Sequence, residues 1–159
     1  MKTCTTPTQL SLDGDAGWEP FDAPALVGES LVFVSGDPLG NRFRVNYFRD
    51  SSRDLVARVW FGPGTAGPPG HAHGGSIAAI FDELLGLAAW AAGHAVVVGN
   101  LNISFRQLIP LEQVVEIKSK IVSEKGRKIM VHGHITDGND TVYAEADCLC
   151  ITIPGRKMD

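Results

Sequence analysis

The chain has little cysteine, and its three cysteines make no pattern of a disulfide framework. Cys148 and Cys150 alternate along one face of a strand-like run, whereas Cys4 lies in the polar N-terminal segment. No histidine stands at metal-ligand spacing beside the pair, so both are interpreted as small buried hydrophobic side chains. Because disulfide-stapled domains belong to oxidising compartments, this scarcity favours a cytoplasmic protein.

Long apolar runs and an excess of basic charge are also missing. The best candidate for a membrane span, residues 77–98, is interrupted by charged residues and glycines, so no span is expected. Residues 1–6 show neither the apolar stretch of a signal peptide nor the Arg-rich character of a transit peptide, which again favours the cytoplasm. The formal net charge of -4 argues against a nucleic-acid partner.

The length suits one compact domain with a lead-in before it. Residues 1–28 are rich in Pro, Gly, Thr and Asp, which predicts an extended or partly helical segment that Trp18 and Phe21 anchor. Residues 29–159 are expected to form the domain. Strands are predicted at 30–35, 42–48, 55–61, 97–106, 114–122, 128–136 and 141–153. Short links between the last three strands favour antiparallel neighbours.

One long helix is predicted after a segment that forbids regular structure. Prolines and glycines fill residues 67–75, and Ser76 opens a run free of both up to Gly86, so the helix begins between Gly74 and Ser76. Apolar residues recur at helical spacing and also cover the other face, which predicts burial nearly all round. The fold class is therefore α+β, one long central helix wrapped by a curved antiparallel sheet.

Two carboxylates, Asp82 and Glu83, stand in this helix with no basic residue three or four positions away. Carboxylates withdrawn from water without a partner collect at catalytic sites, because their protonation is perturbed. The alternative is that one or both acids point to solvent from the helix edge, or are satisfied by a basic residue from elsewhere in the fold, and this interpretation is favoured for Glu83. Asp82 is thus the candidate catalytic acid.

Several motifs in a fixed order resemble those of the hotdog-fold acyl-CoA thioesterases. They are His73-Gly74-Gly75 with Asp82 nine residues after His73, the strand 100–106, Ile109-Pro110-Leu111 and Gly126-Arg127-Lys128. The resemblance covers residues 62–153 and is strongest to the phenylacetate-pathway and thioesterase-superfamily-member type. It implies a hotdog fold whose subunits pair through their sheets as a homodimer or homotetramer, often a dimer of dimers.

The resemblance also implies a reaction: hydrolysis of an acyl-CoA or acyl carrier thioester, with no metal and no cofactor beyond the coenzyme A of the substrate. In it the Gly74 N–H, at the positive end of the helix dipole, stabilises the oxyanion, with Gly75 beside the substrate. Asp82 acts as general base or nucleophile. His73 positions the loop or the substrate, or only caps the loop by hydrogen bonding.

Geometry indicates a site shared between subunits. Gly74 and Asp82 are eight residues apart, which is roughly 12 Å along one helix. One thioester carbonyl therefore reaches both only if they come from two different helices, and the resemblance implies the same arrangement.

Coenzyme A carries phosphates, so an acidic chain needs local cations to bind it. Arg106, Arg127 and Lys128 are the candidates, Arg for bidentate contact and Lys as a point charge. The alternative for Arg127 and Lys128 is a solvated hairpin tip. Asn100 is a further candidate substrate contact, from the strand after the helix.

One position departs from the family pattern. Such relatives commonly carry a hydroxyl residue sixteen positions after the catalytic Asp, where it helps to hold the water, and this chain has Val98 there. Asn100 and Ser104 are expected on the same strand face as Val98 and are the candidates to replace that hydrogen bond.

Three rival interpretations stay open. His71, His73 and Glu83 echo a cupin metal site, but the acid follows too far on and in a helix. A hotdog dehydratase or hydratase also uses a histidine and a helix acid, with different motifs. A non-catalytic acyl-CoA binding or sensing domain is favoured by Val98, although such sensors usually carry an effector domain.

Overall fold

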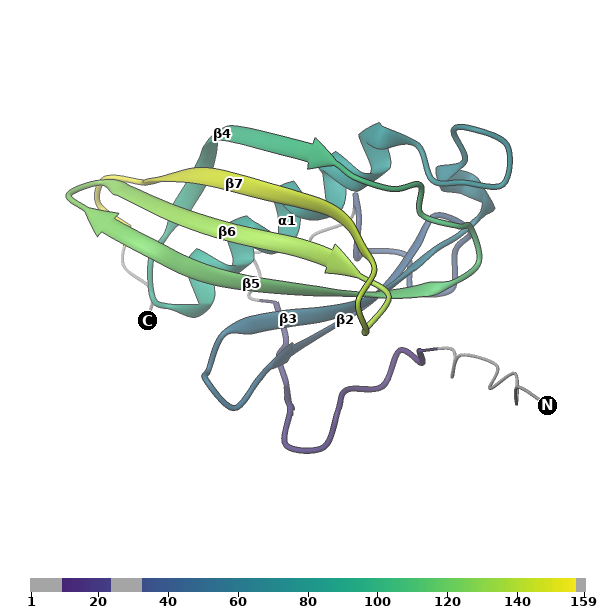
Figure 1. Cartoon of the computed structure of the whole chain (residues 1–159). Coiled ribbons are helices and arrows are strands. Elements are labelled where there is room, and N and C mark those ends of the chain that lie inside the picture. Colours follow the sequence, from purple (N-terminus) through teal and green to yellow (C-terminus); the bar gives the residue numbers. More distant parts are fainter. Residues whose placement is uncertain (1–9, 24–32, 157–159) are drawn as a thin grey trace.

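The computed structural model describes residues 10–23 and 33–156, which form one long helix and a single seven-stranded sheet (Figure 1). The strands are β1 (Glu19–Pro20), β2 (Phe43–Arg49), β3 (Leu55–Phe61), β4 (Val96–Phe105), β5 (Val114–Lys125), β6 (Lys128–Thr136) and β7 (Val142–Thr152). The helices are the short 3-10 helix η1 (Pro63–Thr65) and α1 (Gly74–Ala91). The predicted α+β class, with one long helix, is confirmed.

The sheet has the order β1-β2-β3-β5-β6-β7-β4, and every neighbouring pair is antiparallel. The chain leaves β3 in the middle of the sheet, runs through α1, and adds β4 at the far edge beside β7. It then returns to pair β5 with β3. In Figure 1 the helix lies behind β5, β6, β7 and β4, which curve around it. This crossover places α1 along the inner face of the sheet.

Helix α1 begins at Gly74, inside the predicted window, and packs on β3 to β7. Its buried residues are Ile77, Ile80, Phe81, Leu84, Leu85, Leu87, Ala88 and Ala89. By length and composition alone α1 could cross a membrane, a test that core helices also pass. Cys148 and Cys150 are free and buried on the inner face of β7, as predicted.

The sheet covers only one side of α1. The opposite face of the helix carries five residues at helical spacing, and all of them are exposed or half-exposed in the single chain: Gly75, Ala79, Asp82, Gly86 and Trp90. We call this face the open side of α1. The prediction of burial nearly all round is therefore wrong for one chain, because a single curved sheet can pack against only one face of a helix.

The strand predicted at 30–35 is not found where the structure describes it. Residues 30–32 lie outside the described residues, and 33–35 form a bend and a turn. The turn-forming residues 36–40 follow at once, so the chain reverses before a ladder can form. Beside β2 the sheet has only the two-residue β1 from the lead-in, which pairs with Phe48 and Arg49.

The described part of the lead-in, residues 10–23, is anchored as predicted. The Trp18 ring lies 5.7 Å from that of Phe48, and the Arg49 guanidinium lies 5.1 Å over the ring of Phe21. The predicted domain boundary at residue 28 lies outside the described residues.

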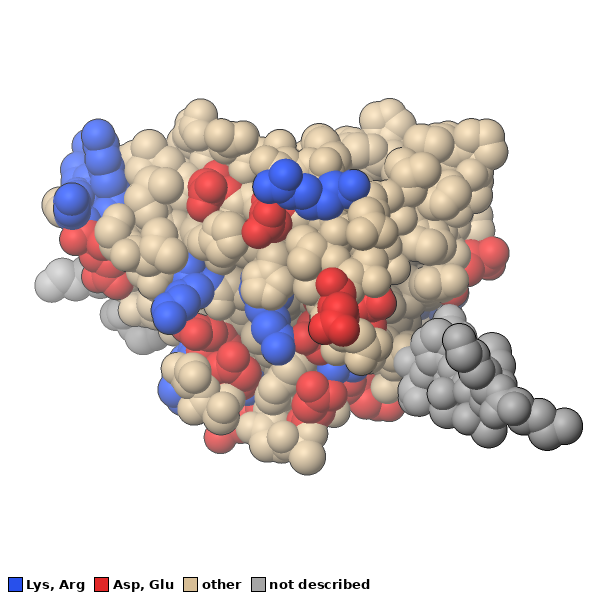
Figure 2. Space-filling model, viewed as in Figure 1, with Lys and Arg blue, Asp and Glu red and all other residues tan. Residues whose placement is uncertain are grey.

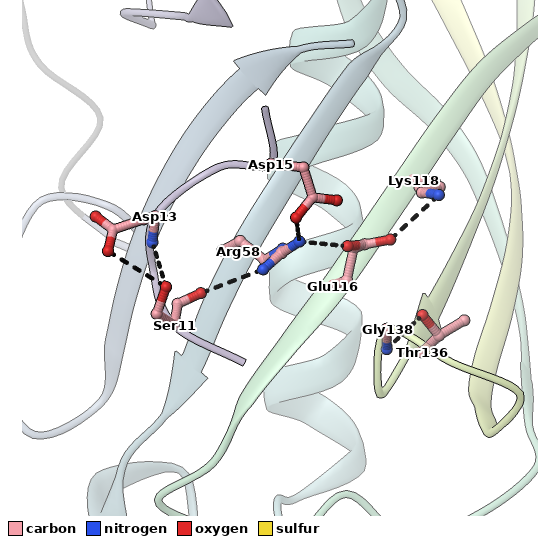
Figure 3. Close-up of polar contacts among 8 residues, drawn as sticks. All are labelled: Ser11, Asp13, Asp15, Arg58, Glu116, Lys118, Thr136 and Gly138. Atoms are coloured by element: carbon pink, nitrogen blue, oxygen red, sulfur yellow. Dashed lines mark hydrogen bonds and ion pairs between the residues drawn. The ribbon is translucent and has the colours of Figure 1, made fainter. Parts of the chain in front are cut away.

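Beneath the lead-in, Arg58 of β3 is buried and forms two ion pairs, and its pair with Glu116 is the most buried among the described residues. Its guanidinium lies 2.7 Å from Asp15 of the lead-in and 2.8 Å from Glu116 of β5 (Figure 3). Trp18 stacks over the guanidinium at 4.9 Å. The cluster fixes the lead-in on the sheet, on the side away from α1.

Candidate active site

The N-terminus of α1 presents one backbone donor without an acceptor. His73 caps the helix, since its ring Nδ1 accepts a hydrogen bond of 2.8 Å from the Gly75 N–H. The His73 carbonyl accepts from the Ser76 and Ile77 amides. Within residues 10–23 and 33–156 the Gly74 N–H has no acceptor. The predicted oxyanion donor is therefore available, whereas the neighbouring Gly75 amide is already engaged by His73.

In the single chain His73 therefore acts as a cap through its hydrogen bond, which is the second of the two interpretations given for it. The His73 amide also donates to the Thr65 carbonyl at 2.7 Å, which ties the segment before the helix to η1. A methyl group added at Gly74 would lie 3.5 Å from the Phe105 ring, which covers this end of the helix from β4. Phe105 itself is exposed, so the helix end is reached from solvent beside it.

Asp82 and Glu83 line a cleft of about 330 Å³ between the open side of α1 and the start of β4. The other lining residues are Gly86, Leu87, Trp90, Val96, Val97 and Val98. Asp82 is exposed in the single chain, so the prediction that the fold withdraws it from water is not met within one chain. Neither carboxylate has an ion-pair partner among the described residues.

Glu83 is bound from elsewhere in the fold, but not by the basic residue that the alternative interpretation named. Its Oε1 accepts a 2.5 Å hydrogen bond from the hydroxyl of Tyr47 on β2. The donor is a neutral phenol rather than a basic residue. Burial, and after it the negative charge of Glu83, raises the pKa of Tyr47 well above its ordinary value, so this hydroxyl keeps its proton.

A β-bulge in β4 changes the predicted strand faces. The register with β7 shifts between Val98 and Asn100, so Val98 and Leu101 both pack toward the core. Val98 lines the cleft with Asp82, whereas Asn100 and Ser104 are exposed on the opposite face of β4. The expectation that Asn100 or Ser104 stands beside Val98 is therefore wrong, and in this chain Asn100 does not reach the cleft.

The predicted basic residues lie at two ends of β4. Arg106 follows the strand near the N-terminus of α1, where its guanidinium pairs with Glu145 at 3.1 Å. Arg127 lies at the other end, where it donates to the carbonyl of Thr152, the residue paired with Val96 of the cleft. Lys128 is exposed beside it, and Figure 2 shows basic side chains gathered at this hairpin. Arg127 and Lys128 therefore lie at the cleft end of the molecule.

The residues of the cupin interpretation are each engaged elsewhere. His71 contacts the Pro69 carbonyl, His73 caps α1, and Glu83 binds Tyr47. In the part of the chain that the structure describes, no three His, Cys, Asp or Glu side chains converge as metal ligands. The metal-independent reaction remains a prediction.

Sequence reasoning missed Tyr47, whose hydroxyl holds Glu83 of the cleft. Tyr47 reaches Glu83 from 36 residues away, and Trp90 Nε1 donates to the Val96 carbonyl at 3.0 Å. No local pattern marks Tyr47, because its position in β2 is that of any inward-facing core residue. Only the pairing of β2 beside the helix brings it to Glu83.

A curved antiparallel sheet around one helix, with a free amide at the helix N-terminus and acids on its open side, defines a hotdog-fold protein. The family model described as the thioesterase superfamily matches residues 69–144. The acyl-coenzyme A thioesterase THEM4 of Bos taurus is 34% identical over 145 residues, which are 86% of this chain and 60% of that protein. The chain belongs to the thioesterase superfamily.

Solved structures agree with the assignment. A thioesterase superfamily protein superposes with a TM-score of 0.68 at 27% identity, over 81% of this chain and 69% of that one. A hypothetical thioesterase protein from Streptococcus pneumoniae, solved with coenzyme A, has a TM-score of 0.62 at 20% identity, covering 70% and 88% of the two chains. The second likeness shows the fold alone. The chain spans about 60% of the length of the bovine relative.

Proposed function

We propose that this protein hydrolyses acyl-CoA thioesters to the free acid and coenzyme A. The observation that carries the proposal is the unpaired Gly74 N–H at the start of α1, with Asp82 free of any cation among the described residues on the open side of the same helix. The names of the relatives support the substrate class, as does the structural neighbour that was solved with coenzyme A.

In the proposed reaction the thioester oxygen binds at the Gly74 N–H, and the helix dipole adds to this stabilisation as negative charge develops. Water attacks the carbonyl carbon while Asp82 removes its proton, and the departing thiolate then takes that proton. The other route is direct attack by Asp82 to give a mixed anhydride, which water hydrolyses afterwards. Both routes use the same two groups.

The site is proposed to form between two copies of the chain. Gly74 and Asp82 lie on one helix roughly 12 Å apart, so one carbonyl cannot contact both in a single chain. Strand β4 stands at the edge of the described sheet with β7 as its one neighbour there, which leaves its other side available to a second copy. A homodimer or homotetramer would bring Asp82 of one subunit to Gly74 of the other.

Arg127 and Lys128 at the cleft end of the molecule are the proposed contacts for the phosphates of coenzyme A, with Arg106 at the other end of β4. His73 would hold the helix N-terminus in shape, and Gly75 would leave room for the substrate beside it. The predicted cytoplasmic location belongs to the same proposal.

A second candidate function is a non-catalytic acyl-CoA binding domain. The observation in its favour is Val98, which places a hydrocarbon in the cleft where relatives of this type commonly carry a hydroxyl. The two functions differ in one measurable outcome, because a binding domain retains the thioester intact.

The test is thiol release from a panel of acyl-CoAs, short to long and including aryl groups. We expect release that survives EDTA and falls about 10²–10⁴-fold in Asp82→Ala. Asp140→Ala, an exposed acid in the β6–β7 turn, is the matched control and should keep full activity. No release from any acyl-CoA, with binding retained, would establish the binding domain instead; loss in EDTA would contradict metal independence.

The shared site has its own test. Gly74→Pro removes the N–H at a helix position that tolerates proline, and Asp82→Ala removes the acid. Each variant alone should be inactive, and mixed dimers should recover activity, because one of their two sites then combines an intact Gly74 with an intact Asp82. Mixed dimers that stay inactive would place both groups within one chain.

A further inference from the structure

Glu83 is the second carboxylate of the cleft and is held in one orientation. The Tyr47 hydroxyl binds its Oε1 at 2.5 Å, and Tyr47 is itself buried in β2 beneath the helix. In the region described by the structure, the second oxygen of Glu83 has no hydrogen-bond donor. The hydrogen bond to one oxygen restricts rotation of the carboxylate, so the direction of its second oxygen is restricted as well.

The cleft offers little else that is polar. Of its eight lining residues, only Asp82, Glu83 and Trp90 carry polar side-chain atoms, and the indole N–H of Trp90 is used by the Val96 carbonyl. Val98 contributes methyl groups, one of them 3.7 Å from where a side chain at Gly86 would begin. Among the described residues, the two adjacent carboxylates are therefore the only side-chain acceptors available to a water molecule in this cleft.

A water that attacks a thioester is held best by two acceptors, one for each hydrogen. We propose that Glu83 is a positioning residue of the reaction, whose free oxygen accepts one hydrogen bond from the attacking water while Asp82 takes the other proton. This inference rests on the proposed hydrolysis. The new bond joins the water oxygen to the carbonyl carbon, the C–S bond breaks, the proton passes through Asp82 to the thiolate, and Glu83 ends unchanged.

The proposal also assigns a purpose to Tyr47. Its hydroxyl holds Glu83 without adding positive charge, so the carboxylate keeps its full strength as an acceptor. A lysine or arginine in that place would compete with the water for both oxygens. In this arrangement Glu83, which is held by Tyr47 of β2, supplies the hydrogen-bond acceptor that Val98 cannot supply.

The first test compares Glu83→Ala and Tyr47→Phe with the wild type on the best acyl-CoA of the panel. We expect kcat to fall by about 10²-fold in Glu83→Ala, as for a misplaced reactant, with KM changed little. Tyr47→Phe removes only the hydrogen bond that holds Glu83, so its kcat should fall less than that of Glu83→Ala. Glu124→Ala, an exposed glutamate on β5, is the matched control. A kcat within about twofold of wild type in a folded Glu83→Ala would overturn the proposal.

The second test is rescue. Val98→Thr places a hydroxyl in the same cleft, so it should restore much of the kcat lost in Glu83→Ala and add little to the wild type. An equal effect of Val98→Thr in both backgrounds would contradict a shared role with Glu83. If Glu83→Ala fails to fold, Glu83→Gln keeps its size and replaces it in the cycle. A wild type without thioesterase activity would refute the proposed function itself, which separates the two failures.

Discussion

Acidic side chains gather in two regions of this molecule, and they differ in what surrounds them. On the outer face of the sheet Glu116 is buried, 2.8 Å from Arg58 and 3.3 Å from Lys118. On the open side of α1, Asp82 and Glu83 have no cation among the described residues, and Glu83 is held by a phenol. Acids matched by buried cations hold a fold together, whereas acids in a cleft without a cation remain available for chemistry.

The hydrogen-bond donors of the two regions show the same contrast. The Trp18 ring stacks over Arg58, and both terminal nitrogens of its guanidinium have acceptors within the chain, while its buried Nε has none among the described residues (Figure 3). The Gly74 N–H, by contrast, has no acceptor among the described residues. Changes in the first region should therefore alter stability, and changes in the second should alter turnover.

Among the changes that compare the two regions here, Gly74→Pro should give the largest effect. It removes the N–H and keeps a residue suited to the first helical position, so activity should fall about 10²–10³-fold with little loss of stability. Gly74→Ala is the control, because it keeps the N–H and its methyl group meets the Phe105 ring at an ordinary 3.5 Å. Thiol release and thermal unfolding are measured side by side. Wild-type activity in both variants would remove Gly74 from the reaction.

The sequence predicts the positions of the helix and strands better than it predicts which side chains are exposed. The strands at 55–61 and 128–136 and the start of α1 at Gly74 are confirmed, because periodicity and turn residues are local signals. The bulge at Gly99 is not predicted, since one inserted residue leaves the apolar pattern nearly intact while it turns Val98 to the cleft. The exposure of Asp82 is missed because periodicity does not say how much of a helix one sheet covers.

The candidate site divides in the same way. Gly74, His73 and Asp82 follow from motif and spacing, and the structure places them at the N-terminus and on the open side of α1. Tyr47 could not be found from the sequence, because its contact with Glu83 joins residues that only the fold brings together.

Glu116→Gln tests the other side of the comparison. The change leaves Arg58 with one fewer buried counter-charge, so the free energy of unfolding should fall by about 3 kcal/mol, while the folded protein keeps its activity. Asp15→Asn is the matched control: Asp15 binds the same guanidinium at 2.7 Å, but its side chain is 59% exposed. Its loss should cost less than about 1 kcal/mol in urea unfolding. Equal costs would show that burial does not decide the strength of these pairs.

The smallest effect is expected at His134, on the same outer face between Lys118 and Glu145. Burial lowers the pKa of His134, and the positive charges of His132 and Lys118 lower it further against the opposing pull of Glu145 and Glu116. The folded state therefore resists a proton that the unfolded chain accepts near its ordinary value of about 6.5, so stability is lost as the pH falls through that value. His134→Gln should lose less stability than the wild type between about pH 7.5 and about pH 5.5, by urea midpoints, and keep its turnover. An unchanged pH dependence would mean that the imidazole is protonated alike in both states. A change in turnover would mean that the outer face is coupled to the cleft, and the division between the two regions would then have to be abandoned.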